Sequence, residues 1–268
     1  MLITSRTNPR IKDIKRLLRR RERDATGLFL AEGLQLVSEA LRTRADITLL
    51  LLAPDLLNPA DLAEVQGHRD IPTLHVTPEV LHSLSPTDGQ HGIAAVVRQR
   101  WEPIEDITPA PGSCWVALTQ IQHPGSLGTI LRVSDSVGGA GVILIGDSTD
   151  PYDPTSVRAS LGAIFSQRLA RTTFADFAAW KTRTKCPVVG TSPSAPTDYR
   201  AASYPSPLVV LMGGERIGLS PEHEALCDPI VRIPMAGRVE SHHVAVAAAL
   251  VLYEVLNQRS PGPAPPPP

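Results

Sequence analysis

Short apolar segments alternate with amphipathic segments along most of this chain, and this alternation limits its possible folds more than any other feature. In the second half, five segments have the length and composition of buried strands: residues 114–118, 141–145, 187–190, 208–212 and 230–233. Helical periodicity follows most of them, at residues 126–137, 157–164, 174–182 and 241–257. Buried strands that alternate with helices predict a parallel sheet covered by helices, which is an α/β fold.

The first hundred residues carry a smaller version of the same pattern. Apolar runs that predict strands occur at residues 28–31, 47–52, 73–76 and 93–97. Helical periodicity runs through Leu34, Val37 and Leu41, and Thr77-Pro78 is typical of a helix start. We therefore expect a small N-terminal α/β domain with a mostly parallel sheet.

A proline-containing acidic stretch separates the two patterns. It spans residues 101–112 and is typical of a linker. We predict domains at residues 1–100 and 113–258 on either side of it. The proline-rich end at residues 259–268 is predicted to be a disordered tail, because it offers little apolar surface to bury.

The formal net charge of −1 conceals a strongly basic N-terminus. Before position 24, only Asp13 and Glu22 oppose nine basic residues, which are Arg6, Arg10, Lys12, Lys15, Arg16, Arg19, Arg20, Arg21 and Arg23. Apolar residues that recur every three or four positions predict one amphipathic helix over residues 8–23, with the arginines on its outer face. Such a surface favours a polyanion, but a solvated helix face or a membrane-surface helix has the same composition.

Composition argues against several other classes of protein. Cys114, Cys186 and Cys227 are odd in number and widely spaced, which argues against a disulfide framework and against a zinc site. The longest apolar run, residues 244–253, is far shorter than the roughly 20 residues that a membrane-spanning helix needs. We expect a soluble, cytoplasmic protein with reduced cysteines and no metal.

Three glycine-containing loops each follow a predicted strand: residues 122–128, 213–218 and 234–238. Parallel α/β sheets bind ligands at the carboxyl ends of their strands, where glycine lets the backbone approach a ligand. We therefore expect the three loops to converge on one site, although glycines that serve only as turns would look the same. None of the loops has the dinucleotide-binding pattern or the P-loop pattern. This argues against a dehydrogenase and against a protein that binds a nucleotide through a P-loop.

Taken in chain order, these loops resemble the three signature motifs of the SpoU (TrmH-like) class of the SPOUT methyltransferase superfamily. Residues 126–132, SLGTILR, are similar to the family motif N-x-G-x-x-x-R. Residues 213–220, GGERIGLS, are similar to G-x-E-x-x-G-L-S. Residues 233–244, IPMAGRVESHHV, are similar to I-P-M-x-G-x-x-E-S-L-N-V.

The first domain extends this resemblance to almost the whole chain. Residues 4–12, 29–33 and 92–96 are similar to the small RNA-substrate-binding domain that precedes many SpoU enzymes. The resemblance therefore favours RNA as the ligand of the basic N-terminus. It also implies a trefoil knot in the second domain, and a homodimer whose active site lies at the interface, where the apolar helix at residues 244–256 can pack. An ordinary core helix would have the same composition.

The activity that the resemblance implies is S-adenosylmethionine-dependent methylation of a ribose 2′-hydroxyl in RNA. Ribosomal RNA is favoured over transfer RNA, because the two-domain arrangement resembles members that act on large-subunit RNA. The catalytic residues implied are Arg132, Glu215, Ser241 and His243. Those implied for the cofactor are Gly213, Gly214, Ile233, Met235 and His242. Those implied for RNA are Arg6, Asn8, Arg10, Lys12, Arg19, Arg20 and Ser126.

Three of these residues have more than one interpretation. The family assigns activation of the hydroxyl to the arginine that matches Arg132, although a guanidinium is a poor base and can act as a phosphate clamp or lie in a surface salt bridge. Glu215 either anchors a substrate group or Arg132, or is a structural acceptor between loops. Ser241 either hydrogen-bonds the substrate or caps the helix predicted at residues 241–257.

The chain departs from the family motifs at three of these positions. Ser126 replaces an asparagine of the first motif, and His242 and His243 replace a leucine and an asparagine of the third. Three interpretations follow: a tolerated variant with the same chemistry, an RNA-binding relative with weakened or lost catalysis, or an enzyme with an altered substrate. His243 is also a candidate base, in which case activity would fall below about pH 6.5. Adjacent histidines on a helix point apart, which argues against a metal site.

Overall fold

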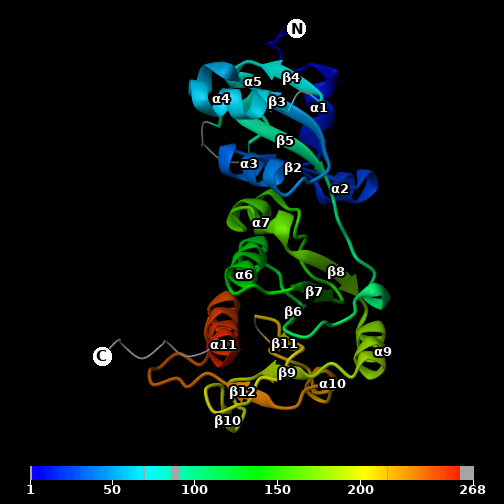
Figure 1. The fold of residues 1–268 in the computed structure, drawn as a ribbon, viewed down its shortest axis with the longest axis vertical. Coiled ribbons are helices and arrows are strands. Elements are labelled where there is room, and N and C mark those ends of the chain that lie inside the picture. The colour runs from blue at the N-terminus through cyan, green and yellow to red at the C-terminus, as the bar shows by residue number, and fades with distance from the viewer. Residues whose placement is uncertain (1, 69, 86–90, 216, 260–268) are drawn as a thin grey trace, which may run out of the picture. The chain divides into compact units, whose positions relative to one another are not determined.

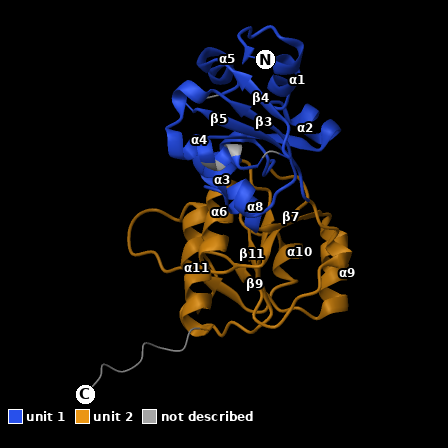
Figure 2. Cartoon of the chain, turned by 45° about the horizontal axis from the view of Figure 1, so that its top comes forward, with its two compact units in different colours: residues 1–100, 150–166 blue, residues 101–149, 167–268 orange. Residues whose placement is uncertain are grey.

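The computed structural model describes residues 2–68, 70–85, 91–215 and 217–259. The chain forms two compact units: Met1–Arg100 together with Asp150–Ser166, and Trp101–Thr149 together with Gln167–Pro268 (Figure 2). The sequence pattern had assigned residues 150–166 to the second domain, whereas the structure packs them with the first unit. The predicted tail, apart from Arg259, lies outside the described residues.

A seven-stranded sheet forms the centre of the second unit, in the order β10-β12-β9-β11-β6-β7-β8, and each of its pairings is parallel. Its strands are β6 (Cys114–Thr119), β7 (Gly141–Ile145), β8 (Arg168–Thr172), β9 (Val188–Thr191), β10 (Thr197–Asp198), β11 (Leu208–Met212) and β12 (Ile230–Arg232). The predicted parallel α/β class is therefore confirmed. The trefoil knot stays a prediction.

Helices cover both faces of this sheet (Figure 1). They are α6 (Pro124–Ser136), α9 (Phe174–Thr184), α10 (Pro221–Glu224) and α11 (Val244–Arg259), and a 3₁₀ turn, η2, spans Ile104–Asp106. Trp115 and Ala117 of β6 share one core with Phe177 and Trp180 of α9. Side chains alternate along a strand, so the equally buried residue between them, Val116, faces the opposite side, where α6 and α11 pack against each other.

The sheet of the first unit is mixed, which corrects the prediction of a mostly parallel sheet. Its order is β1-β4-β3-β5-β2, and β5 pairs antiparallel with both β3 and β2. The strands are β1 (Leu2–Ile3), β2 (Leu28–Glu32), β3 (Ile47–Leu52), β4 (Thr73–Val76) and β5 (Ile93–Arg98). The apolar run of β5 is buried in either direction, so its composition carries no information about its orientation.

Helices from two parts of the chain pack in the first unit. They are α1 (Pro9–Arg16), α2 (Arg20–Thr26), α3 (Leu34–Arg42), α4 (Pro59–Gln66), α5 (Pro78–His82), α7 (Pro154–Ala159) and α8 (Ala163–Ser166), with a 3₁₀ turn, η1, at Pro54–Leu56. The helix predicted at residues 157–164 is two helices, because the backbone of Leu161 and Gly162 takes positive φ angles of 49° and 103°. Helix α7 packs beside β2.

The basic N-terminal segment also departs from its prediction. The single helix expected over residues 8–23 is two helices, α1 and α2, separated at residues 17–19. All the arginines of this segment were predicted to be exposed. This is wrong for Arg23, whose side chain is 1% exposed. Its Nε lies 2.7 Å from Oδ2 of Asp150, and its Nη1 donates to the carbonyl of Leu17 at 2.9 Å. The partner carboxylate is 127 residues away, so local periodicity could not reveal this contact.

Among the described residues, none of the helices is long and apolar enough to cross a membrane.

Candidate active site

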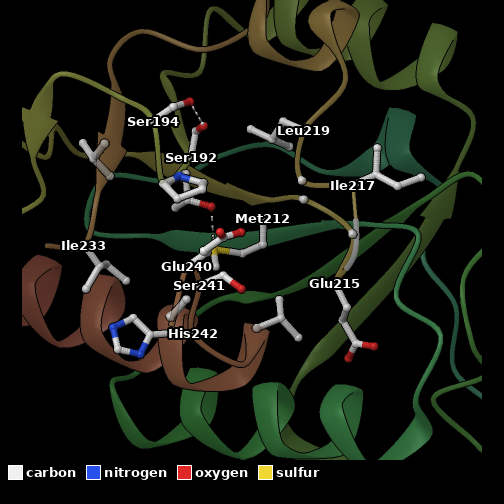
Figure 3. A pocket seen from close by; sticks show the side chains of 18 of the residues that line it. Ser192, Ser194, Met212, Glu215, Ile217, Leu219, Ile233, Glu240, Ser241 and His242 are labelled. Carbon is white, nitrogen blue, oxygen red and sulfur yellow. Dashed lines mark hydrogen bonds between the residues drawn. The ribbon is translucent and has the colours of Figure 1, made fainter. Parts of the chain in front are cut away.

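A cavity of about 450 Å³ lies at the carboxyl ends of β9, β11 and β12. Its walls come from the segments that follow these three strands, and Figure 3 shows their side chains around a common space. The volume falls within the range of roughly 300–1,000 Å³ that is typical of small-molecule sites. The loops predicted at residues 213–218 and 234–238 both contribute to the wall, through residues 213–215, Ile217, Gly218 and Met235.

The loop after β11 is closed on itself by its backbone. Gly214 and Gly218 exchange two backbone hydrogen bonds, of 3.1 Å and 2.9 Å. A Cβ atom on Gly213 would collide with the backbone of Gly218 and Leu219. Glycine is therefore required at position 213 by the close approach of the two arms of the loop, and this approach shapes one wall of the cavity.

The lining combines apolar side chains with carboxylates. Met212, Ile217, Leu219, Ile233 and Met235 supply the apolar surface. The carboxylates come from Glu215, Glu224 and Glu240. The five residues predicted to contact the cofactor, Gly213, Gly214, Ile233, Met235 and His242, all line this one cavity. Such a lining suits a ligand with a flat apolar part and a positive charge.

One wall of the cavity was not anticipated. The segment Thr191-Ser192-Pro193-Ser194, which follows β9, lines the cavity, and Oγ of Ser192 lies 3.0 Å from Oγ of Ser194 (Figure 3). A signal was present in the sequence, because small polar residues directly follow the strand predicted at residues 187–190. These residues lack glycine, so they do not show the feature that marks the three predicted loops.

The first predicted loop reaches the site through a buried serine. Ser126, in the first turn of α6, is 4% exposed, and its hydroxyl donates to Oε1 of Glu215 at 2.7 Å. Nε2 of His243 lies 3.0 Å from the same hydroxyl oxygen. The second carboxylate oxygen of Glu215 faces His123, with 3.6 Å between Oε2 and Nε2. The three predicted loops therefore meet. The hydroxyl of Ser126 is occupied by its contacts with Glu215 and His243 and is not exposed to RNA.

Helix α11 begins three residues later than predicted, at Val244. Ser241 therefore cannot be the residue that caps it, and it lies instead in the cavity wall. His243 takes the capping position: its Nδ1 accepts from the amide of Ala245 at 3.2 Å, and its carbonyl accepts from the amide of Val246. Histidine is not among the residues preferred at this position, so sequence preference could not place the cap.

Arg132 is not brought into the cavity. It lies on α6, six residues after Ser126, and is exposed. Its guanidinium has no hydrogen-bond or ion-pair partner in the described part of the chain, and it is not among the described residues that line the cavity. The structure thus brings together Glu215, Ser241, Ser126 and His243 but leaves Arg132 on the surface of the same unit.

A second histidine stabilises the end of the loop after β11. Oγ of Ser220 lies 2.6 Å from Nδ1 of His223, and the ring of His223 packs edge-on against Phe174. Burial lowers the pKa of His223 because the charged ring would lose hydration. A neutral His223 therefore holds Ser220 at the start of α10, which supplies Glu224 to the cavity.

The residues predicted to contact RNA lie around α1 and α2, apart from Ser126. Arg6, Arg10, Lys12, Arg19 and Arg20 are exposed. Asn8 has a structural role, because its side chain accepts from the amide of Arg10 at 2.9 Å and caps α1. The first unit therefore presents a basic surface of at least five side chains.

Within the described ranges, no group of three or more His, Cys, Asp or Glu side chains is arranged to hold a metal ion.

Two family models match the chain in sequence. The SpoU rRNA Methylase family matches residues 113–253, which contain the cavity, and the MRM3-like substrate binding domain matches residues 8–95. Together the two models extend over both predicted domains.

Individual relatives match nearly the whole chain. A 23S rRNA (uridine(2479)-2'-O)-methyltransferase of Streptomyces viridochromogenes is 30% identical, over 97% of this chain and 93% of the relative. A 23S rRNA (guanosine(2553)-2'-O)-methyltransferase of Bacillus subtilis is 26% identical, over 94% of this chain and 98% of the relative.

Solved structures give the same result for the fold. The AdoMet-bound rRNA methyltransferase from Sinorhizobium meliloti superposes with a TM-score of 0.89 and 35% identity, and covers 97% of this chain and 99% of its own. The sequence motifs, the parallel sheet with its cavity and these likenesses agree, and the chain belongs to the SpoU rRNA methylase family.

Proposed function

We propose that this protein transfers a methyl group from S-adenosylmethionine to a ribose 2′-hydroxyl of ribosomal RNA. The observation that carries the proposal is the cavity formed by two of the predicted motif loops at the carboxyl edge of the sheet. Relatives that match 97% and 94% of the chain are named 23S rRNA 2'-O-methyltransferases. A structural neighbour with a TM-score of 0.89 is AdoMet-bound.

The lining of the cavity fits this cofactor. Ile233, Met235 and Leu219 offer apolar surface for an adenine ring, and the Gly213-Gly214 backbone allows close approach. The carboxylates of Glu215, Glu224 and Glu240 favour a cationic ligand electrostatically. S-adenosylmethionine, when bound, supplies an electrophilic methyl group on a positively charged sulfur.

The remaining residues are assigned to positioning the RNA and to stabilising the charge that develops on its reacting oxygen. A guanidinium is a poor base, so the contribution of Arg132 is to bind a phosphate and to stabilise the negative charge that develops on the 2′-oxygen. Ser241 lies in the cavity wall, and we assign it a hydrogen bond to the RNA at the reacting nucleotide. Glu215 supplies an acceptor at the edge of the cavity, where Ser126 and His243 support it.

Replacement of Gly213 by alanine tests the cofactor site. The added methyl group collides with the backbone at Gly218 and Leu219, and the hydrogen-bonded loop cannot easily relax. Overpacking of this kind costs about 1–3 kcal/mol, which corresponds to roughly 5- to 150-fold weaker binding. Calorimetric titration with S-adenosylmethionine measures the change.

Gly237→Ala is the matched control. Its added methyl group meets no protein atom within 4 Å, so the loop should keep its shape and the affinity should fall less than in Gly213→Ala. No binding by the unchanged protein would contradict the proposal and favour the alternative, an RNA-binding relative that has weakened or lost catalysis. An affinity of Gly213→Ala equal to that of the unchanged protein would mean that the cofactor binds elsewhere.

We assign RNA binding to residues 1–100 and methyl transfer to residues 113–258. The exposed basic residues of α1 and α2 and the match of residues 8–95 to a substrate binding domain support this division. Ribosomal RNA is preferred over transfer RNA because both relatives above are named for 23S rRNA. We also place the protein in the cytoplasm, in keeping with its three unpaired cysteines.

The basic surface makes a testable prediction about salt. Arg10 and Lys12 are exposed on α1, and their replacement by glutamine should lower the slope of log affinity for RNA against log salt. The expected decrease is about 0.7–0.9 for each phosphate contact that is lost. Filter binding at several salt concentrations measures the slope. Arg42→Gln, on α3 and paired with Glu39, is the control; equal slopes for both variants would exclude α1 from the RNA interface.

A homodimer is part of the proposal. Val246 and Tyr253 of α11 are large side chains that are 47% and 52% exposed. Arg132 lies on α6, which packs against α11, and is also exposed. A two-fold contact through these helices would cover the apolar side chains and direct the Arg132 of one protomer toward the cavity of its partner.

A further inference from the structure

Ser126, Glu215 and His243 form a chain of hydrogen bonds across residues that lie far apart in the sequence. Ser126 comes from α6, Glu215 from the loop after β11, and His243 from the start of α11. The Ser126 hydroxyl stands between the other two, 2.7 Å from Oε1 of Glu215 and 3.0 Å from Nε2 of His243. Ser126 is almost fully buried, so water does not compete readily for these contacts.

The contacts determine where each proton lies. Nδ1 of His243 accepts from the amide of Ala245, so it carries no proton. In a neutral imidazole the proton is then on Nε2, which donates to Oγ of Ser126. The serine has one proton of its own, and it points to Glu215. Each group therefore donates in the same direction, from the helix amide to the carboxylate.

This direction has a consequence for Glu215. The carboxylate receives a hydrogen bond on Oε1, which restricts its rotation. Its Oε2 faces the imidazole of His123, which is 73% exposed. Figure 3 shows Glu215 apart from Glu240, at the edge of the cavity that both residues line. Glu215 is thus an oriented acceptor.

We propose that Ser126 and His243 are one coupled unit, in which His243 is a positioning residue that orients Glu215 through Ser126. The inference rests on the proposed function and deepens it, because Glu215 belongs to the same site. The two positions are matched in size: the short serine leaves room for the long imidazole, and the imidazole reaches both the serine and the amide of Ala245. Ser126 and His243, which each replace an asparagine of a family motif, therefore compensate each other.

A double-mutant cycle with Ser126→Asn and His243→Asn tests the coupling. The first change would place a carboxamide against the imidazole in a buried space, and the second would leave a side chain too short to hold Ser126 and cap α11 together. Each single variant should lower kcat about tenfold or more, because Glu215 loses its orientation, with the affinity for S-adenosylmethionine nearly unchanged. The double variant should be at least about fivefold more active than the product of the single effects predicts.

Thr129→Asn combined with His243→Asn is the control cycle. Thr129 is exposed on α6, three residues after Ser126, and its hydroxyl donates to the carbonyl of Gly125. The fold-decrease in kcat of this double variant should equal the product of the decreases of its two single variants. If the same holds for Ser126→Asn and His243→Asn, the two residues act independently and the proposal is wrong.

Imidazole ¹⁵N NMR decides the question without any RNA. In the unchanged protein His243 should be in the Nε2-protonated tautomer, and Ser126→Ala should make this proton exchange with water at least about tenfold faster, since its acceptor is gone. A mixture of tautomers in the unchanged protein, or unaltered exchange in Ser126→Ala, would overturn the coupling. Because the spectrum does not depend on methyl transfer, a protein that binds no cofactor but shows this tautomer would refute the proposed function alone.

Discussion

Replacement of Arg23 by methionine is expected to lower the stability of the first unit by about 3–5 kcal/mol. Arg23 is 1% exposed and pairs with Asp150, which is 7% exposed. Its Nη2 also lies 3.4 Å from Oδ2 of Asp153. Removal of the guanidinium leaves the carboxylate of Asp150 buried without its positive partner, and the hydration that it lost on folding is no longer compensated. Arg23 is therefore one of the side chains that join residues 1–100 to the segment 150–166, beside the contacts of Tyr152 with Phe29 and with the backbone of Arg100.

Hydrogen exchange followed by mass spectrometry measures this effect unit by unit. Peptides from residues 2–68 and 150–166 should exchange faster in Arg23→Met. Fluorescence of Trp101, Trp115 and Trp180 reports the second unit alone, because all three belong to it. The urea concentration at the midpoint of the fluorescence transition should therefore change little, whereas hydrogen exchange in the peptides of the first unit becomes faster.

Two further variants separate the ion pair from other effects. Arg16→Met removes an exposed arginine that pairs with the exposed Asp13, and a pair of this kind contributes about 0–1 kcal/mol. Arg23→Met combined with Asp150→Asn removes both charges and keeps an oxygen for the amide of Tyr152, so it should recover part of the loss. If Arg23→Met is no less stable than Arg16→Met, the buried pair contributes little to the unit.

Replacement of Arg132 by alanine is expected to lower kcat by about 10²–10³, the cost of removing one group that stabilises charge in a transition state. The affinity for S-adenosylmethionine should change little, because Arg132 is not among the described residues that line the cavity. Methyl transfer to 23S rRNA from a radiolabelled cofactor measures the rate. Arg183→Ala is the control, since Arg183 lies on α9 and its Nη2 donates to the carbonyl of Glu105. Equal rates for the two variants would remove Arg132 from the reaction.

A mixture of two variants, each with little activity at a limiting concentration of S-adenosylmethionine, tests whether Arg132 acts across a dimer. Arg132→Ala subunits keep an intact cavity, and Gly213→Ala subunits keep an intact Arg132. Co-expressed chains form heterodimers in which one of the two sites has both parts, so random pairing should restore about one quarter of the full activity. If Arg132 serves the cavity of its own protomer, no complete site forms and the mixture stays inactive.

Local pattern predicted the central strands of the second unit well. The bounds of β7 and β11 agree with the predicted segments, because both strands are buried on each face and consist almost entirely of apolar residues. Strand β8 was missed. Arg168 and Arg171 interrupt its pattern, and they are accommodated because their guanidinium groups lie over the rings of Trp115 and Trp101. A strand whose polar residues find partners only in the folded sheet has no local signature.

Only part of the candidate site was predicted, because local pattern does not report contacts that form only in the folded protein. Two of the three glycine loops and all five predicted cofactor residues line one cavity, because parallel strands place their carboxyl ends on the same edge of a sheet. The start of α11, the cap that His243 forms and the buried position of Ser126 were not predicted. They depend on contacts over as many as 117 residues of sequence, which periodicity within one segment cannot report.

The sequence by itself determined the α/β class, most of the strands and helices and the loops that form the cavity, because hydrophobic periodicity and glycine positions act over a few residues. Only the tertiary structure decided that β5 runs antiparallel to its neighbours, that residues 150–166 pack with the first unit, and that Ser126 meets His243. Each of these depends on which distant groups can fill a buried space and satisfy one another's hydrogen bonds and charges. That choice is made when the whole core packs.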